Sequence, residues 1–336
     1  MKEYLKALKK EIIRDKYLIL VEILIILTFF IPMNYYIEIG GGMTNIGSRV
    51  QVENAYKEKG SLNIVYVKEL NATLGTYLLS FILPDWDLTK IDAYQYNSKE
   101  SIKDLTTRAK LDLNKVSNTA IKNAFLEANK KIEEKSNKLI VYATYDDYQT
   151  NLKIGDEILK IDNISSNDTS KYKEYLNTKN TNDKVIVQIK RNNKIKDIEA
   201  TIYTTNNENV LGISLINDIN YQTNPKVKIN FKKNEEGPSG GLITALKIYN
   251  QLTKEDITKG KVVAATGTLE EDGTVGEIGG IKYKVLGTKK ADIFLVPKEN
   301  YKEAVKVAKK HKLKVKIIGV HTFKEAINEL NKELSN

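Results

Sequence analysis

The spacing of apolar and polar residues predicts three regions that follow the N-terminal segment. Residues 38–137 hold the strand-like runs RVQV, SLNIVYV and TYLLSFIL, followed by a polar helical stretch from about 98 to 137. So few strands bury too little apolar surface for an independent core. We therefore expect them to pair with strands much further along the chain.

Residues 138–204 form a separate β-rich unit in this pattern. The strand-like runs KLIVYATY, DKVIVQIKR and IKDIEATIY accompany the segment LKIGDEILKIDN and a short helix SKYKEYLN, and Asn192 and Asn193 mark a tight turn. From 210 to 336, strands such as KVKINF, VVAATGTL, DIFLVP and KVKIIGV alternate with helices. That alternation predicts an α/β domain.

The N-terminal run from Tyr17 to Ile37 is apolar enough to predict a membrane-spanning helix. About 21 helical residues would cover roughly 31 Å, the thickness of a bilayer core. Lysine and arginine are frequent in residues 1–16, whereas none follows the run until Arg49. We therefore expect a single-pass protein of the cell membrane, with a cytoplasmic N-terminus, a helix over 17–37 and the remainder outside. A cleaved signal peptide is the alternative, but the bulky exit sequence MNYYIEI does not suit a signal peptidase.

Composition excludes several kinds of chemistry. The 336 residues include no cysteine, which leaves no disulfide framework, thiolate metal site or cysteine nucleophile. The two histidines are too few for a histidine-built metal centre. We expect no metal and no cofactor. The formal net charge of +10 would suit an anionic partner. However, the basic residues are scattered and no nucleic-acid-binding module is recognisable, so we expect no nucleic-acid partner.

A candidate nucleophile lies in the string Gly237-Pro238-Ser239-Gly240-Gly241. Glycines on both sides let the backbone turn sharply and leave the Ser239 hydroxyl uncrowded. The helix that follows directs N–H groups and a positive dipole end towards developing negative charge. A glycine-rich helix start capped by serine also occurs for purely structural reasons, so the string needs a base before it indicates catalysis.

The string GEIGGIKYK supplies two candidate bases. Gly279 and Gly280 turn the chain into a helix that carries Lys282 and Lys284. Residues two apart on a helix point to nearly opposite sides, so at most one of these lysines can address the serine. A lysine amine in an apolar pocket has a lowered pKa and can take the hydroxyl proton. Without that pocket, either lysine would be a solvated surface residue.

Together the two strings resemble the signature of Lon-type serine proteases, G-P-S-x-G with T-G-x-…-G-x-x-G-x-I-G-G-x-x-x-K. The resemblance implies a Ser-Lys dyad in which Lys284 is the base for Ser239, with Lys282 as a surface neighbour. It also implies that Thr266 orients the lysine. The other supporting and oxyanion positions implied by the resemblance are Gly237, Pro238, Gly240 and the acidic position Glu236.

The segment from Leu152 to Asn163 resembles the PDZ-domain signature L-x-x-G-D-x-I-L-x-I-D/N-G. The resemblance implies a module that adds a peptide ligand as a strand to a sheet edge. No G-L-G-F-like loop for a carboxylate terminus is visible, so a degenerate module that acts as a spacer or gate is the alternative. The signature residues are Leu152, Gly155, Asp156 and Ile158.

Nearly the whole chain resembles the small membrane-anchored PDZ-Lon proteases of bacteria, including the sequence Y-Y-I-x-x-G at Tyr35 to Gly40. The resemblance implies an α/β, α+β-like Lon-type protease domain, split into 38–137 and 210–336 by an inserted PDZ-like domain at 138–204. It implies an endopeptidase for protein or peptide substrates and, because Lon-type domains often form rings, a homo-oligomer. The sequence has no G-x-x-x-x-G-K-[ST] string, so we expect cleavage of unfolded or exposed segments without ATP.

Two other functions compete with the protease. Ser239, Asp292 and His321 occur in the chain order of an α/β-hydrolase triad, and GPSGG fits the nucleophile elbow of such an esterase. However, the residues KKNEE separate the preceding strand from the turn, whereas an elbow passes directly from strand to helix. The other competitor is a non-catalytic, membrane-anchored PDZ scaffold, whose function would survive the replacement of Ser239 by alanine.

Overall fold

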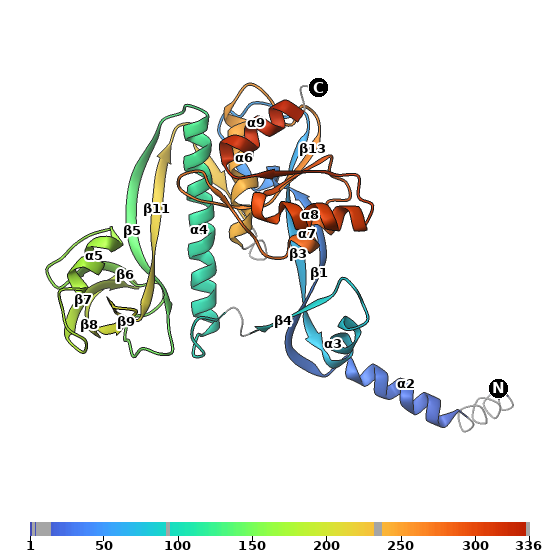
Figure 1. Ribbon diagram of the computed structural model, residues 1–336, viewed down its shortest axis with the longest axis horizontal. Helices are drawn as coiled ribbons and strands as arrows, with labels where there is room; N and C mark the ends of the chain where they lie inside the picture. Colours follow the sequence, from blue (N-terminus) through green and yellow to red (C-terminus); the bar gives the residue numbers. More distant parts are fainter. Residues whose placement is uncertain (2–3, 5–14, 92–94, 232–236, 334–336) are drawn as a thin grey trace.

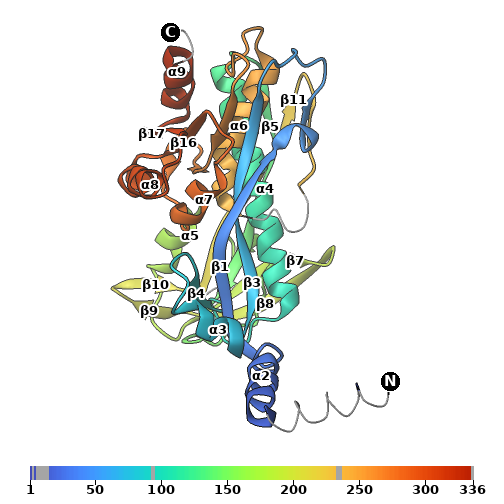
Figure 2. The same ribbon diagram turned by 90° about the vertical axis from the view of Figure 1, so that its right-hand side faces the viewer.

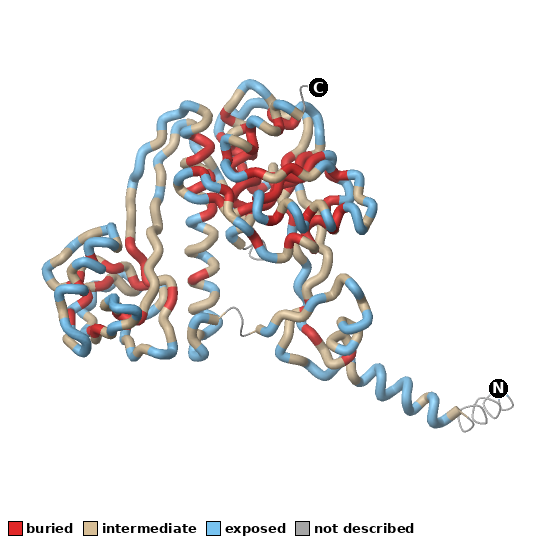
Figure 3. The backbone as a smooth tube through the Cα atoms, viewed as in Figure 1, coloured by how far each residue is buried: buried red, intermediate tan, exposed pale blue. Residues whose placement is uncertain are grey.

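The computed structural model describes residues 1, 4, 15–91, 95–231 and 237–333. An α/β body and a smaller β-rich unit flank the long helix α4 (Ile102–Glu127), and a small lobe carries the apolar helix α2 (Lys16–Thr28) at its far end (Figure 1). Buried residues gather in the body and in the β-rich unit, whereas α2 is largely exposed (Figure 3).

A six-stranded sheet in the order β17-β16-β13-β3-β1-β4 forms the centre of the body. β3 pairs antiparallel with β1 and parallel with β13, where Asn63 lies opposite Ala264. The early strands therefore pair with a strand much further along the chain, as expected. The strands are β1 (Pro32–Asn45), β3 (Ser61–Thr73), β4 (Asp87–Lys90), β13 (Val262–Ala265), β16 (Ile293–Pro297) and β17 (Lys316–Val320).

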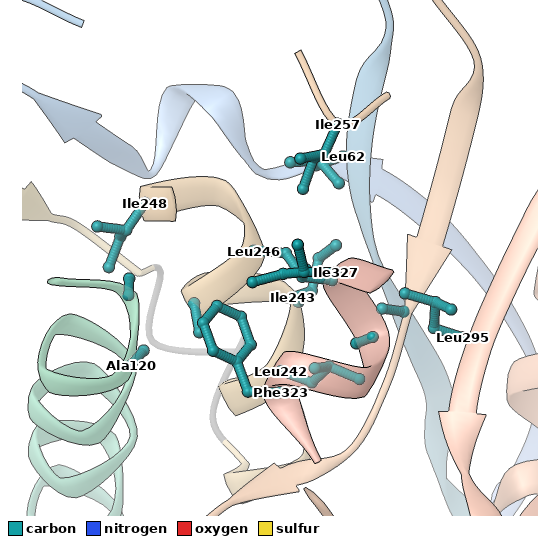
Figure 4. Close-up of a cluster of buried hydrophobic side chains, with 14 of the residues drawn as sticks. Leu62, Ala120, Leu242, Ile243, Leu246, Ile248, Ile257, Leu295, Phe323 and Ile327 are labelled. Carbon is teal, nitrogen blue, oxygen red and sulfur yellow. The ribbon is translucent and has the colours of Figure 1, made fainter. Parts of the chain in front are cut away.

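Helices cover both faces of this sheet. In β16, Ile293 and Leu295 belong to one hydrophobic cluster and Phe294 to the other, as expected for a strand between two helical layers. The first cluster includes Leu242 of α6 and Phe323 of α9 (Figure 4). The first layer contains α4, α6 (Gly241–Leu252) and α9 (Phe323–Glu333), and the second contains α7 (Ile281–Gly287) and α8 (Lys298–Lys310).

Short elements complete the body. Two-residue and three-residue strands form two further pairs: β2 (Val50–Val52) with β12 (Val227–Ile229), and β14 (Thr268–Leu269) with β15 (Val275–Gly276). Two 3₁₀ turns, η1 (Ile46–Ser48) and η3 (Pro238–Gly240), precede β2 and α6.

The run TYLLSFIL, which was predicted as a strand, instead forms most of helix α3 (Leu74–Ser80) and the turn after it. Thr73 and Thr76 make a capping box, in which each side chain accepts a hydrogen bond from the other residue's backbone N–H. The box satisfies N–H groups that a helix start otherwise leaves free. The capping hydrogen bonds therefore favour a helix where the apolar pattern alone predicted a strand.

The β-rich unit is a five-stranded sheet in the order β11-β5-β6-β7-β8. Its core contains Leu139, Ile189 and the helix residue Tyr172. β5 begins at Ile132, a few residues before the expected start of this unit. The elements are β5 (Ile132–Thr144), β6 (Glu157–Ile161), α5 (Thr169–Leu176), β7 (Lys184–Arg191), β8 (Lys194–Thr201) and β11 (Ile213–Thr223), with the hairpin β9 (Tyr203–Thr205) and β10 (Glu208–Val210).

β5 and β11 extend as a two-stranded ribbon beside α4 (Figure 1). The Tyr142 hydroxyl of β5 donates to Asp112 of α4 at 3.0 Å. The Tyr221 hydroxyl of β11 donates at 3.2 Å to Glu271, in the turn between β14 and β15, and Glu271 also accepts from Thr119 of α4. These contacts fix the ribbon to the helix and to the body.

The predicted membrane-spanning helix over 17–37 is wrong in its extent. α2 ends at Thr28, and Pro32 begins β1, in which Ile37 pairs with Leu70 and Leu88 and is fully buried. Proline lacks the N–H that would continue a helix, and a sheet edge is available to the residues that follow it. In the part of the chain that the structure describes, no helix is both long and apolar enough to cross a membrane. β1 and β3 extend beyond the body into the small lobe that carries α2 (Figure 2).

Candidate active site

The sharp turn η3 presents Ser239 at the start of α6. Its backbone is held by the loop after β13, because the Gly267 N–H donates to the Ser239 carbonyl at 2.9 Å and the Leu242 N–H donates to the Gly267 carbonyl at 3.2 Å. Gly240 is buried against Ile64, so only a small residue fits beside the serine. The turn therefore fixes Ser239 directly before a helix N-terminus, where negative charge is stabilised.

The lysine amine that meets this serine is that of Lys284, on α7. Its Nζ donates to Ser239 Oγ at 2.7 Å and to Thr266 Oγ1 at 3.1 Å. Lys284 is only 5% exposed, and this burial lowers the pKa of its amine to about 8. About a tenth of the amine is therefore neutral at pH 7, and this neutral form can accept the serine proton.

The absence of a carboxylate partner distinguishes Lys284 from another buried lysine. Lys247, which is 3% exposed, forms an ion pair with Glu58. Among the residues that the structure describes, Lys284 forms no ion pair with a carboxylate, and its close polar neighbours are two hydroxyl groups. Hydroxyl groups stabilise an ammonium ion less than a carboxylate does, so these two contacts do not cancel the lowering of the Lys284 pKa by burial.

Thr266 holds the lysine in place. It lies between β13 and β14, is almost completely buried, and anchors its backbone N–H on the Leu295 carbonyl at 3.0 Å. Its hydroxyl accepts from Lys284 and lies 3.3 Å from the Ser239 carbonyl, to which it donates. One threonine thus contacts both members of the candidate dyad.

The remaining predicted positions that the structure describes lie outside the Ser239–Lys284 contact. Gly237, with φ +148°, and Pro238 lie immediately before Ser239 in the turn, while Glu236 lies outside the described residues. Lys282 points elsewhere, because its Nζ lies 3.2 Å from Asp87 and 3.2 Å from the Pro84 carbonyl. It is the surface neighbour that the resemblance implied.

The alternative Ser-His-Asp triad is not assembled around Ser239. His321 is 58% exposed at its side chain, and its Nδ1 lies 3.8 Å from Glu299. The Asp292 carboxylate accepts the Val262 N–H at 2.8 Å, at the start of β13. Ser239 instead meets a lysine, so the geometry supports the Ser-Lys alternative and not the esterase triad. The described residues also contain no group of three or more potential metal ligands.

In the β-rich unit, the signature residues have structural roles. Leu152 and Ile158 lie in the core, and Gly155 has φ +90°. Asp156 is buried and makes two hydrogen bonds of 2.6 Å to the guanidinium of Arg191. This ion pair joins the loop before β6 to the end of β7.

A loop that we did not recognise in the sequence leads into the edge strand β11. Leu211 is buried and Gly212 has φ +68°, with the Tyr148 side chain packed where a Cβ atom would lie. β11 lies near the start of α5, because Asn217 donates to the Asn167 carbonyl at 2.9 Å, while Asn209 of β10 donates to the Leu176 carbonyl at the end of α5, also at 2.9 Å. The string V-L-G-I was the available signal for this glycine turn.

A serine hydroxyl hydrogen-bonded to a buried lysine amine is the arrangement expected of a Ser-Lys hydrolase. Comparison with known families supports that class: residues 221–332 match the Lon protease (S16) C-terminal proteolytic domain, and residues 133–202 match the PDZ domain. The chain therefore carries a Lon-type proteolytic domain, which supports a serine peptidase, together with a PDZ domain.

Individual relatives match the C-terminal part alone. The Lon protease of Trichlorobacter lovleyi is 34% identical over 95 residues and that of Neorickettsia sennetsu 35% identical over 95 residues, in each case 28% of this chain and 11% of the relative. The chain thus spans about a tenth of the length of these curated relatives. Among solved structures, the PDZ domain of the SdrC-like protein from Listeria monocytogenes has 21% identity and a TM-score of 0.22, covering 23% of this chain and 86% of that chain.

Proposed function

We propose that the protein is a serine endopeptidase that cleaves unfolded or exposed protein segments without ATP. The observation that carries the proposal is the 2.7 Å contact between the Lys284 amine and the Ser239 hydroxyl in a buried site. The Lon-type domain match supports the reaction class. The sequence contains no G-x-x-x-x-G-K-[ST] string, which is why we propose flexible segments and not folded proteins as substrates.

In the proposed reaction, neutral Lys284 accepts the proton of the Ser239 hydroxyl as the oxygen attacks a peptide carbonyl. The charge that develops on the carbonyl oxygen lies near the N-terminus of α6 and the backbone of η3. The Lys284 ammonium then gives its proton to the leaving amine, and water hydrolyses the acyl-enzyme with the same lysine as base. Thr266 keeps the amine in position throughout.

The proposed protease domain is discontinuous, with residues 38–137 and 210–336 on either side of the PDZ domain, except that the start of β5 and the whole of β11 (Ile213–Thr223) belong to the sheet of the PDZ domain. Support comes from the central sheet, in which β3 lies between β1 and β13. A peptide ligand of the PDZ domain would add to β11, because this strand is at the edge of its sheet and lies beside α5. A homo-oligomer stays a prediction.

We also propose that α2 attaches the protein to a membrane. α2 exposes Leu20, Ile23 and Leu27, and the turn after the neighbouring α3 exposes Phe81 and Ile82. An exposed apolar surface of this kind is unfavourable in water and suits lipid. Co-flotation of the chain with liposomes, lost when the exposed leucines and isoleucines of α2 are changed to serine, would support attachment, whereas a parent chain that stays in the dense fraction would contradict it.

The test of the proposed activity is cleavage of an unfolded model protein by the full chain in detergent, without ATP. The full chain is needed because a truncation at residue 38 would remove the first residues of β1. We expect cleavage by the parent and by Lys282→Arg, and none by Ser239→Ala or Lys284→Ala. An inert parent would favour the scaffold alternative.

A further inference from the structure

A cavity of about 400 Å³ lies between the protease body, α4 and the PDZ ribbon. Its volume is within the range of sites that bind small ligands or side chains. Val116 of α4 forms one wall, Tyr142 of β5 together with Ser214 and Ile216 of β11 forms the second, and Pro238 with Leu269 forms the third. We call it the ribbon pocket.

The ribbon pocket adjoins the nucleophile turn. Pro238 is the residue directly before Ser239, and Thr268, which also lines the pocket, directly follows Gly267. The Gly267 N–H donates a hydrogen bond to the Ser239 carbonyl. A polypeptide whose scissile carbonyl lies at Ser239 would therefore have a neighbouring side chain within reach of this pocket.

The chemistry of the walls favours an apolar occupant. The exposed surface of the pocket is mostly apolar, and its charged groups already have partners within the protein. The Lys115 amine lies 3.3 Å from Glu270, and the Asp112 carboxylate accepts the Tyr142 hydroxyl at 3.0 Å. A charged substrate side chain would lose hydration and find no free counter-ion, whereas a large apolar one would gain burial.

We propose that the ribbon pocket receives a large apolar side chain of the substrate close to the scissile bond, and that β11, the edge strand of the PDZ domain's sheet, sets this preference by forming one wall. The proposal rests on the proposed peptidase function. It makes the PDZ domain part of the substrate site, in addition to any ligand that it binds at its own sheet edge. The sharpest probe is Ser214, because it is a small residue on that wall and the catalytic contacts do not involve it.

The first experiment measures kcat/KM on peptides that differ at one position near the scissile bond, with leucine, phenylalanine or alanine there. Burial of one such side chain is worth about 1.5–3 kcal/mol, so we expect the parent to favour leucine and phenylalanine about 10-fold to 100-fold. Ser214→Trp, which fills the pocket, should reduce this ratio to near one while cleavage of the alanine peptide persists. Ile195→Trp, at a PDZ residue that is 65% exposed and outside the pocket, should keep the parent ratio. An unchanged ratio in a folded Ser214→Trp variant would overturn the proposal.

The second experiment does not depend on hydrolysis. The Ser239→Ala chain is photo-crosslinked to an unfolded peptide that carries p-benzoylphenylalanine as its large apolar side chain. We expect crosslinks at residues 112–116, 214–216 or 268–270, and their loss in a Ser239→Ala chain that also carries Ser214→Trp. If crosslinks form at these residues but the parent cleaves no substrate, the proposed peptidase function is refuted and the proposed use of the pocket stands. An active parent with crosslinks only elsewhere would refute the pocket alone.

Discussion

The pH dependence of cleavage should report the ionisation of Lys284. With a pKa of about 8, about 9% of the amine is neutral at pH 7 and about 90% at pH 9. At the ordinary lysine pKa of 10.5, the neutral fraction at pH 7 would be only about 0.03%, so burial raises it about 300-fold. We therefore expect kcat/KM to rise about tenfold from pH 7 to pH 9 and then to level off.

The assay uses an internally quenched peptide without titratable side chains, with initial rates from pH 6 to pH 10 and the full chain in detergent. Lys284→Arg should be inactive throughout, because a guanidinium keeps its proton over this range. Lys282→Arg is the matched control, since it keeps a cation beside Asp87 and leaves the dyad intact. A flat profile, or parent-like activity of Lys284→Arg, would refute the assignment of Lys284 as the base.

Three further changes have calculable results. Thr266→Val removes the hydroxyl that contacts Lys284, and should lower kcat about 10-fold to 100-fold with little change in KM. Lys284→Met should stabilise the fold by up to about 3 kcal/mol at pH 7, because burying the Lys284 ammonium costs the parent free energy of folding. This cost is full below pH 8 and vanishes as the pH rises towards 10.5. Urea unfolding at pH 7 and at pH 10.5, followed by Trp86 fluorescence, measures the difference. Asp156→Asn breaks the buried pair with Arg191 and should destabilise the PDZ domain by about 3 kcal/mol, measured by amide exchange over 133–202.

Each of these expectations has a contrary result. An unchanged kcat in Thr266→Val would show that the threonine does not position the amine. A Lys284→Met chain that is less stable than the parent at pH 7 would show that the amine is stabilised, not strained, by its surroundings. Parent-like exchange in Asp156→Asn would show that the Arg191 pair contributes little.

The sequence was most informative where function restricts several residues at once. The glycine-rich strings pointed to Ser239 and to either Lys282 or Lys284, and the resemblance to Lon-type serine proteases selected Lys284. The 2.7 Å contact needs α7 and η3 to pack together, and residue spacing alone could not provide that distance.

Other features depend on contacts that a linear pattern does not contain. The apolar run at residues 17–37 predicted one helix, yet Ile37 pairs with Leu70 in the sheet, and the capping box at Thr73 makes a helix where a strand was expected. The ribbon pocket was not foreseen, because Val116, Ser214 and Leu269 come from segments far apart in the sequence.

The most direct test of the central claim is the mass of the intermediate on the full chain. A slowly deacylating peptide ester is mixed with the protein, and the reaction is quenched with acid. The protein is then digested, and the mass of the fragment that contains Ser239 is measured by mass spectrometry. The account predicts the acyl mass on Ser239, formed faster at pH 9 than at pH 7 and absent from Ser239→Ala and Lys284→Arg. Turnover without an adduct on Ser239, or an adduct on another residue, would contradict it.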